Sequence, residues 1–352
     1  MPENSSISSS EPNRKARHSV YCLILFALIT GLMEPWLYGF ARTYYTDDTF
    51  LLCHWLKERV GLESVSADIV FIGDSTLRSA VNPAVVEKHS GHAAINLGTV
   101  ASSGLMDDYY LLRSYVVKHG APKAVVMMHG FPAWDKNLQR DLYNLYYSSP
   151  AETAVLLNES QLGLMEAADS LAQNCLLSYR YKPYLRSAMS HAAKGDFDFY
   201  AVATRHNKNF LQAREQLGYY PDEGKFTLAE DRVIERYRHY LNETAFRISG
   251  ANSYFMKKIL ALAGEYGFGV YYAHSPLYKK CMVSDDPKLL VTGLQKYLEE
   301  TARESGHFHM LYKNIPIAGR DDLGSFVNHL NARGAAEFSA FLAAQLKMNL
   351  QD

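Results

Sequence analysis

The sequence predicts an α/β protein with a central parallel sheet, helices on both faces, and one membrane-spanning helix near the N-terminus. Short apolar segments rich in β-branched residues alternate with longer segments of helical periodicity. Each apolar segment ends at a glycine or a polar residue, as strands of a parallel sheet do. The chain has 352 residues, of which 48% are hydrophobic and 21% charged, a composition typical of packed globular proteins.

The charge and cysteine content exclude several functional classes. The 36 Lys and Arg residues nearly balance the 37 Asp and Glu residues, so no nucleic-acid partner is predicted. Four cysteines without CxxC spacing predict neither a disulfide scaffold nor a zinc site. His307 and His309 share one face of a predicted strand, but no third ligand accompanies them, so we predict structural roles. We therefore predict no metal and no cofactor.

The first apolar segment predicts a membrane anchor. A basic cluster at residues 14–18 precedes Val20–Met33, which carries no charge, and the apolar character resumes after Glu34 and Pro35. As one helix, residues 19–41 would extend over about 34 Å, enough to cross the hydrocarbon core of a bilayer.

The position of the basic cluster predicts the orientation of this anchor. Positive charge stays on the cytoplasmic side, which makes residues 1–18 a cytoplasmic tail. Residues 42–66 would then be a linker to a domain at 67–352 that lies outside the cytoplasm, in the periplasm or at the cell surface. A cleaved signal peptide and a buried core helix are the two alternatives.

The domain is predicted to alternate strands and helices around one large insertion. Residues 136–225 are rich in Tyr, Leu and Ala with few strand signals, which predicts a mostly helical insertion. Glycines or polar residues mark the ends of the elements on either side. The predicted strands are Ala67–Ile72, Ala93–Leu97, Lys123–Met128, Phe268–Ala273 and Phe308–Tyr312. The predicted helices are Pro83–His89, residues 104–119, Ser253–Tyr266, Pro287–Glu304 and Arg333–Met348, the last with Asn331 as its N-cap.

Reactive side chains follow the carboxyl ends of these strands, where functional groups gather in parallel sheets. Ser75 follows the first strand and His329 precedes the last helix, so we predict a nucleophile and its general base. The backbone N–H groups of Ser75 and Gly98 are predicted to hold a developing oxyanion. Three further residues are candidates for lining the pocket, namely Asp74, His129 and His274. The adjacent acids of the second helix, Asp107 and Asp108, are predicted to be solvated.

Three short motifs resemble blocks of the SGNH (GDSL-type) hydrolase superfamily. They are Phe-Ile-Gly-Asp-Ser at 71–75, Asn-Leu-Gly at 96–98 and His-Leu-Asn-Ala-Arg-Gly-Ala at 329–335. The resemblance spans about residues 67–135 and 250–346. It implies a three-layer α/β fold in which Ser75 is the nucleophile, Gly98 donates to the oxyanion and His329 is the base.

Two positions depart from the family's pattern. The third strand is followed by His129, Gly130 and Phe131, without the Asn that completes the family's oxyanion hole. Many SGNH-like proteins that modify bacterial envelope polymers also lack this Asn, so its absence points toward that branch. Position 326 is Phe, where the family has an Asp three residues before the His. Either Asp322 folds back onto the imidazole as the third member, or the site is a Ser–His dyad, or it is degenerate.

The combination of anchor, external domain and helical insertion resembles the accessory proteins of envelope acylation. Those proteins act beside a multi-span membrane-bound O-acyltransferase. The resemblance therefore implies a Ser-dependent O-acyltransferase, with acetyl as the expected group, that modifies an envelope or exported polysaccharide or a glycolipid through acyl-Ser75. The alternatives are a membrane-anchored carbohydrate or lipid esterase and a catalytically inactive SGNH scaffold that binds glycan.

Overall fold

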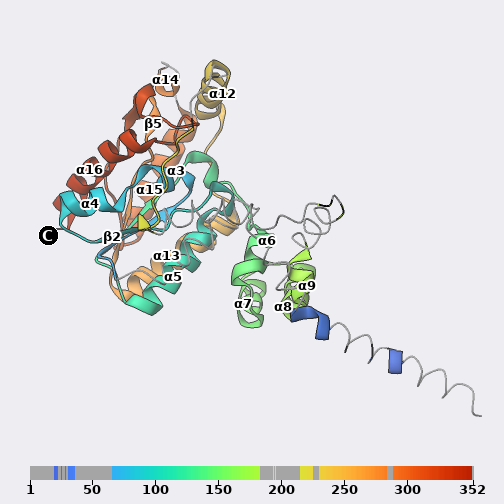
Figure 1. Cartoon of the computed structure of the whole chain (residues 1–352). Coiled ribbons are helices and arrows are strands. Elements are labelled where there is room, and N and C mark those ends of the chain that lie inside the picture. Colours follow the sequence, from blue (N-terminus) through green and yellow to red (C-terminus); the bar gives the residue numbers. More distant parts are fainter. Residues whose placement is uncertain are drawn as a thin grey trace, which may run out of the picture.

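The computed structural model describes residues 66–182, 215–224, 230–283 and 288–350, with a few separate positions at 20–35, 193 and 195. Its centre is a five-stranded sheet in the order β2-β1-β3-β4-β6, with every neighbouring pair parallel (Figure 1). This confirms the predicted α/β class, and all five strands overlap the predicted segments. They are β1 (Ile69–Gly73), β2 (Ala94–Asn96), β3 (Ala124–Met128), β4 (Gly269–Tyr272) and β6 (Phe308–Met310).

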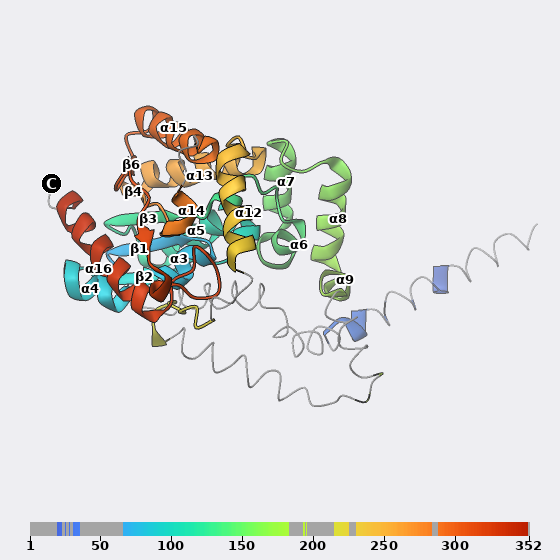
Figure 2. The same cartoon turned by 90° about the horizontal axis from the view of Figure 1, so that it is seen from above.

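The order of the strands reverses beside β1. The first strand of the chain pairs with β2 on one side and with β3 on the other, as the succession of strands in Figure 2 shows. Connections that leave such a switch point run to opposite faces of the sheet and open a crevice at the carboxyl ends of the two strands. Gly73 and Met128 are in register there, so the residues that directly follow the two strands lie side by side at this edge of the sheet.

Helices cover both faces of the sheet, which explains why β1 and β3 are buried along their whole length. On one face α16 packs against α3 and α4, and on the other α13 packs against α5 (Figures 1 and 2). The bounds of these helices are α3 (Ser75–Ala80), α4 (Pro83–Ser90), α5 (Leu105–His119), α13 (Gly250–Tyr266), α15 (Leu289–Glu304) beside β6, and α16 (Ala332–Asn349).

Local caps fix the ends of the predicted helices. The side chain of Asn331 accepts a hydrogen bond from the N–H of Gly334, which confirms the predicted N-cap of α16. Ser249 caps α13 in the same way. Gly91 and Gly267 end α4 and α13 with left-handed backbone, the conformation that glycine adopts at no steric cost.

The segment between β3 and β4 holds helices beside the sheet (Figure 1). The described part of residues 136–225 contains no strand. Its helices are α6 (Arg140–Leu142), a π-turn at Tyr143–Tyr147, α7 (Pro150–Asn158), α8 (Leu164–Cys175) and α9 (Leu177–Arg180), followed later by α12 (Glu230–Glu243). A small parallel pair that the sequence did not predict, β5 (Leu277–Tyr278) and β7 (Ile317–Ala318), lies near the turn α14 (Lys279–Met282).

The predicted tail at 1–18, the linker up to residue 65 and much of the predicted span at 19–41 lie outside the described residues. The positions described within the span, Val20–Cys22, Leu25, Leu28 and Gly31–Pro35, are helical. Among the described residues, no helix has the length and apolarity that a membrane crossing requires.

Gly73, the last residue of β1, cannot be replaced without strain. Its φ is +154°, and a Cβ there would lie 1.9 Å from the carbonyl oxygen of Met128. We expect Gly73→Ala to lower the free energy of unfolding by roughly 3 kcal/mol or more, measured by urea denaturation. Gly91→Ala is the matched control, because φ is +79° but no atom lies within 4 Å, and it should cost about 1 kcal/mol. Equal losses in the two variants would contradict the steric argument.

Candidate active site

Asp74 joins the ends of β1 and β3 to the start of α3. One carboxylate oxygen accepts hydrogen bonds from the N–H of Thr76 at 2.8 Å and from its hydroxyl at 2.6 Å. The other accepts from the N–H of Gly130 at 2.9 Å. Asp74 is only 1% exposed, so these bonds satisfy a carboxylate that water does not reach. They fix Ser75 as the first residue of α3, partly exposed at the crevice.

Ser75, His329 and an unpredicted carboxylate, that of Asp222, form one chain of hydrogen bonds. The Nε2 atom of His329 lies 3.0 Å from Oγ of Ser75, and its Nδ1 lies 3.1 Å from Oδ2 of Asp222. The predicted approach of Ser75 and His329 is therefore observed across 254 residues of sequence. A carboxylate on Nδ1 makes that nitrogen the donor and leaves Nε2 to accept the proton of the serine hydroxyl.

Asp222 is held in its ionised form by four donors. Besides His329, the N–H and the hydroxyl of Ser325 donate to Oδ2, and the N–H of Gly224 donates to Oδ1. Burial alone would raise the pKa of Asp222, but these hydrogen bonds outweigh it and hold the pKa well below its usual value. The N–H of Asp222 also donates to the carbonyl of Leu330, which fixes its loop against the His329 loop.

Asp322 does not reach the imidazole, so its prediction as the third member is wrong. Its Oδ2 accepts from the N–H of Gly319, closing the 3-10 turn Arg320–Asp322, and its Oδ1 lies 3.3 Å from Nε of Arg333. The turn thus directs the carboxylate toward α16 and away from His329. The sequence gives only a weak signal for Asp222. It lies in Pro221-Asp222-Glu223-Gly224, a pattern typical of an ordinary turn within the insertion.

Gly98 lies beside the site, but its N–H is already engaged. It donates to Oδ1 of Asn96 at 2.9 Å, while Nδ2 of Asn96 donates to the carbonyls of Leu77 and Val81 at the end of α3. Gly98 therefore takes part, through Asn96, in the hydrogen bonds that join β2 to the end of α3. Its N–H does not point to the free position that the predicted role as an oxyanion donor requires. The N–H of Ser75 can still donate to an oxyanion, because the N–H of a first helical residue has no acceptor within its helix.

His129 and Asp108 form a buried pair behind Asp74. Nε2 of His129 hydrogen-bonds Oδ2 of Asp108, and its Nδ1 lies 3.9 Å from Oδ2 of Asp74. Asp108 is 1% exposed and Asp107 bonds the hydroxyl of Tyr147, so the prediction that both acids are solvated is wrong. Burial would lower the pKa of His129, but the carboxylates of Asp108 and Asp74 raise it above its usual value. His129 therefore supports Asp74 from within the core.

His274, the remaining candidate for the pocket, is a core residue. It is 2% exposed, its ring packs edge-on against Tyr272, and its Nε2 lies 3.3 Å from Oε1 of Gln295. The hydroxyl of Tyr312 donates to its carbonyl. Burial lowers the pKa of His274 to about 4, so the ring is neutral in the folded protein at neutral pH.

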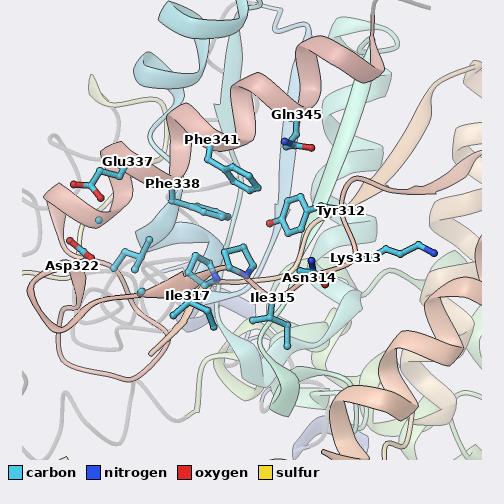
Figure 3. Close-up of a pocket in the computed structure, with 15 residues that line it drawn as sticks. Tyr312, Lys313, Asn314, Ile315, Ile317, Asp322, Glu337, Phe338, Phe341 and Gln345 are labelled. Atoms are coloured by element: carbon cyan, nitrogen blue, oxygen red, sulfur yellow. The ribbon is translucent and has the colours of Figure 1, made fainter. Parts of the chain in front are cut away.

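A separate pocket of about 490 Å³ lies on the other side of the His329 loop. Figure 3 shows the rings of Tyr312, Phe338 and Phe341 turned toward this space. Asp322 and Leu330 also line it, whereas the three members of the hydrogen-bonded chain do not. The described residues contain no cluster of three or more His, Cys, Asp or Glu side chains that could hold a metal ion.

No protein-family model matches the sequence, and no curated protein matches it. The fold and site together define an α/β protein with a hydrogen-bonded Ser–His–Asp chain at the switch point of its sheet.

The buried His274 predicts a loss of stability in mild acid. Because its folded pKa lies below the unfolded value of about 6.5, its contribution is complete above that pH and is lost as the pH falls toward 4. We expect wild type to lose on the order of 3 kcal/mol more than His274→Gln between pH 7.5 and pH 4. Urea denaturation at both pH values measures the difference, and parallel losses in the two proteins would contradict a neutral buried ring.

Proposed function

We propose that this protein is a Ser-dependent O-acyltransferase of the SGNH type, which acetylates an envelope or exported polysaccharide or a glycolipid through an acyl-Ser75 intermediate. The single observation that carries the proposal is the chain from Ser75 through His329 to Asp222, at 3.0 Å and 3.1 Å. A serine hydroxyl is a weak nucleophile until an oriented imidazole takes its proton, and this geometry supplies both requirements.

The proposed reaction proceeds in two balanced steps. Oγ of Ser75 attacks the carbonyl of an acyl donor while Nε2 of His329 takes its proton, and the bond from the acyl carbon to the leaving group breaks as His329 returns the proton to that group. A hydroxyl of the acceptor then attacks acyl-Ser75, His329 takes its proton, and the ester bond to Ser75 breaks with reprotonation of Oγ. Asp222 stabilises the imidazolium in both steps. Water in place of the acceptor gives an esterase.

The described N-terminal positions support an anchor at residues 19–41, and the basic cluster at residues 14–18 supports a domain outside the cytoplasm. Val20, Leu25, Leu28 and Leu32 are helical, and each side chain is more than half exposed. Lipid would cover such side chains at little cost. A multi-span membrane-bound O-acyltransferase is the proposed acyl donor. The pocket with Tyr312, Phe338 and Phe341 is separate from the three members of the hydrogen-bonded chain, so the acceptor of the proposed reaction is not assigned to it.

A second candidate function, an inactive scaffold that binds glycan, is favoured by one observation. The N–H of Gly98 donates to Asn96, which leaves the expected oxyanion donor occupied. A scaffold has no need of that donor.

Trapping at Ser75 tests the proposal. We expect the full-length protein in detergent to react with a fluorophosphonate and to cleave p-nitrophenyl acetate, and Ser75→Ala or His329→Ala to reduce both by at least about 10³-fold. Ser253→Ala, on α13, is the matched control and should react like wild type. Equal labelling of Ser75→Ala and wild type would contradict the nucleophile. No reaction of folded wild type would favour the scaffold, and acetyl transfer to glycan against release to water separates transferase from esterase.

The two carboxylates that compete for the third role should behave differently. Asp222→Asn removes the charge that stabilises imidazolium at His329, so kcat/KM for p-nitrophenyl acetate should fall by roughly 10²–10⁴-fold. Asp322→Asn keeps an oxygen that can accept from the N–H of Gly319 and weakens only the ion pair with Arg333, so kcat/KM should stay within about threefold of wild type. Similar losses in both variants, or a loss confined to Asp322→Asn, would overturn the assignment of Asp222.

A further inference from the structure

Acyl transfer at Ser75 needs a hydrogen-bond donor beyond those assigned so far. The tetrahedral intermediate places negative charge on the former carbonyl oxygen, and donors already aimed at that position contribute most to catalysis. The N–H of Ser75 is one candidate donor. The N–H of Gly98 already donates to Oδ1 of Asn96, so it is not available as a second donor to the oxyanion.

The side chain of Asn328 lies near Gly130, Thr76 and Asp74, which surround Ser75. Its Nδ2 is 3.2 Å from the point at which a Cβ of Gly130 would stand, and Cγ2 of Thr76 and Oδ2 of Asp74 lie 3.2 Å and 3.3 Å from the same point. Thr76 and Asp74 flank Ser75 in sequence, and Asn328 directly precedes His329. The amide therefore lies beside Gly130, just past the end of β3, close to the side chains on either side of Ser75 in the sequence. Gly130, having no side chain, leaves room for it.

The amide of Asn328 is also free to bind a ligand. Within the described part of the chain, its side chain makes no hydrogen bond, and it is only partly buried. Two other asparagines near the sheet are fully used by the fold. Asn96 accepts from Gly98 and donates to two carbonyls of α3, and Asn252 accepts from Leu105 and donates to the carbonyls of Ala133 and Trp134. The amide N–H groups of Asn328 are thus available to donate to a ligand.

We propose that Nδ2 of Asn328 donates a hydrogen bond to the oxyanion that forms when Ser75 attacks an acyl carbonyl. The inference rests on the proposed function and deepens it, because it completes the same site with a residue from the His329 loop. The amide donates in the transition state and gives up no proton. A neutral amide also leaves the charge balance of Asp222 and His329 unchanged.

The test uses full-length protein with p-nitrophenyl acetate as the substrate. Asn328→Leu keeps the shape and removes the donor, so kcat should fall by about 10²–10³-fold with KM changed by less than about threefold. Asn328→Asp places a negative charge against the developing oxyanion, so its kcat should fall by at least as much. The affinity for phenylboronic acid, which forms a tetrahedral adduct on serine, should weaken in parallel with kcat/KM. The acid limb of the pH–rate profile should stay at the wild-type pH in Asn328→Leu, because His329 keeps its partners. Asn158→Ala, an exposed asparagine on α7, is the control.

Each outcome decides between distinct failures. Wild-type kcat and boronate affinity in folded Asn328→Leu would overturn the inference while the proposed function stands. A loss of kcat with a shifted acid limb and unchanged boronate affinity would make Asn328 a positioning residue for His329 and would also overturn it. An inactive but folded wild type that ignores the boronate would overturn both the inference and the function on which it rests.

Discussion

The buried carboxylate of Asp74 is the interaction on which the rest of the site depends. It binds Thr76 at the start of α3 and Gly130 at the end of β3, so two neighbouring strands and one helix share a single anion. A buried carboxyl group without hydrogen-bond partners would be very unfavourable, which means that these elements must meet in one geometry to satisfy Asp74. His129 lies behind it and is itself paired with Asp108, so a row of polar groups extends from Asp74 into the core. The location of Ser75 follows from this arrangement.

The sequence predicted the sheet well because its signals are local. Short apolar runs with β-branched residues, such as Val70–Ile72, are typical of buried strands, and polar or glycine residues directly behind them mark the strand ends. The approach of Ser75 and His329 could also be predicted, since parallel strands bring their carboxyl ends to one edge. Asn331 likewise marks the start of the last helix, because an N-cap is recognised from the residue type alone.

The remaining features depend on contacts that no local pattern encodes. Asp222 reaches His329 across 107 residues, from a turn whose sequence resembles any surface turn. Asp322 is the nearer acid in sequence, but its carboxylate accepts a hydrogen bond from the N–H of Gly319 within its own 3-10 turn. Asp108 was expected in solvent because adjacent acids usually are, and only the imidazole of His129 makes its burial tolerable. For Asp222 and Asp108 a tertiary partner outweighed the ordinary preference of the residue, whereas for Asp322 a local turn did so.

The origin of Asp222 in the segment between β3 and β4 has a consequence for the order of folding. The candidate site joins three stretches of chain separated by 254 and 107 residues, so it forms only after two long loops have closed. Contacts of such high sequence separation develop late, after the local strand–helix units of the sheet. A chain that has formed its sheet but has not yet docked the turn at Asp222 would hold Ser75 beside an imidazole with no fixed tautomer. The hydrogen-bonded chain of Ser75, His329 and Asp222 would then be complete only at the end of folding.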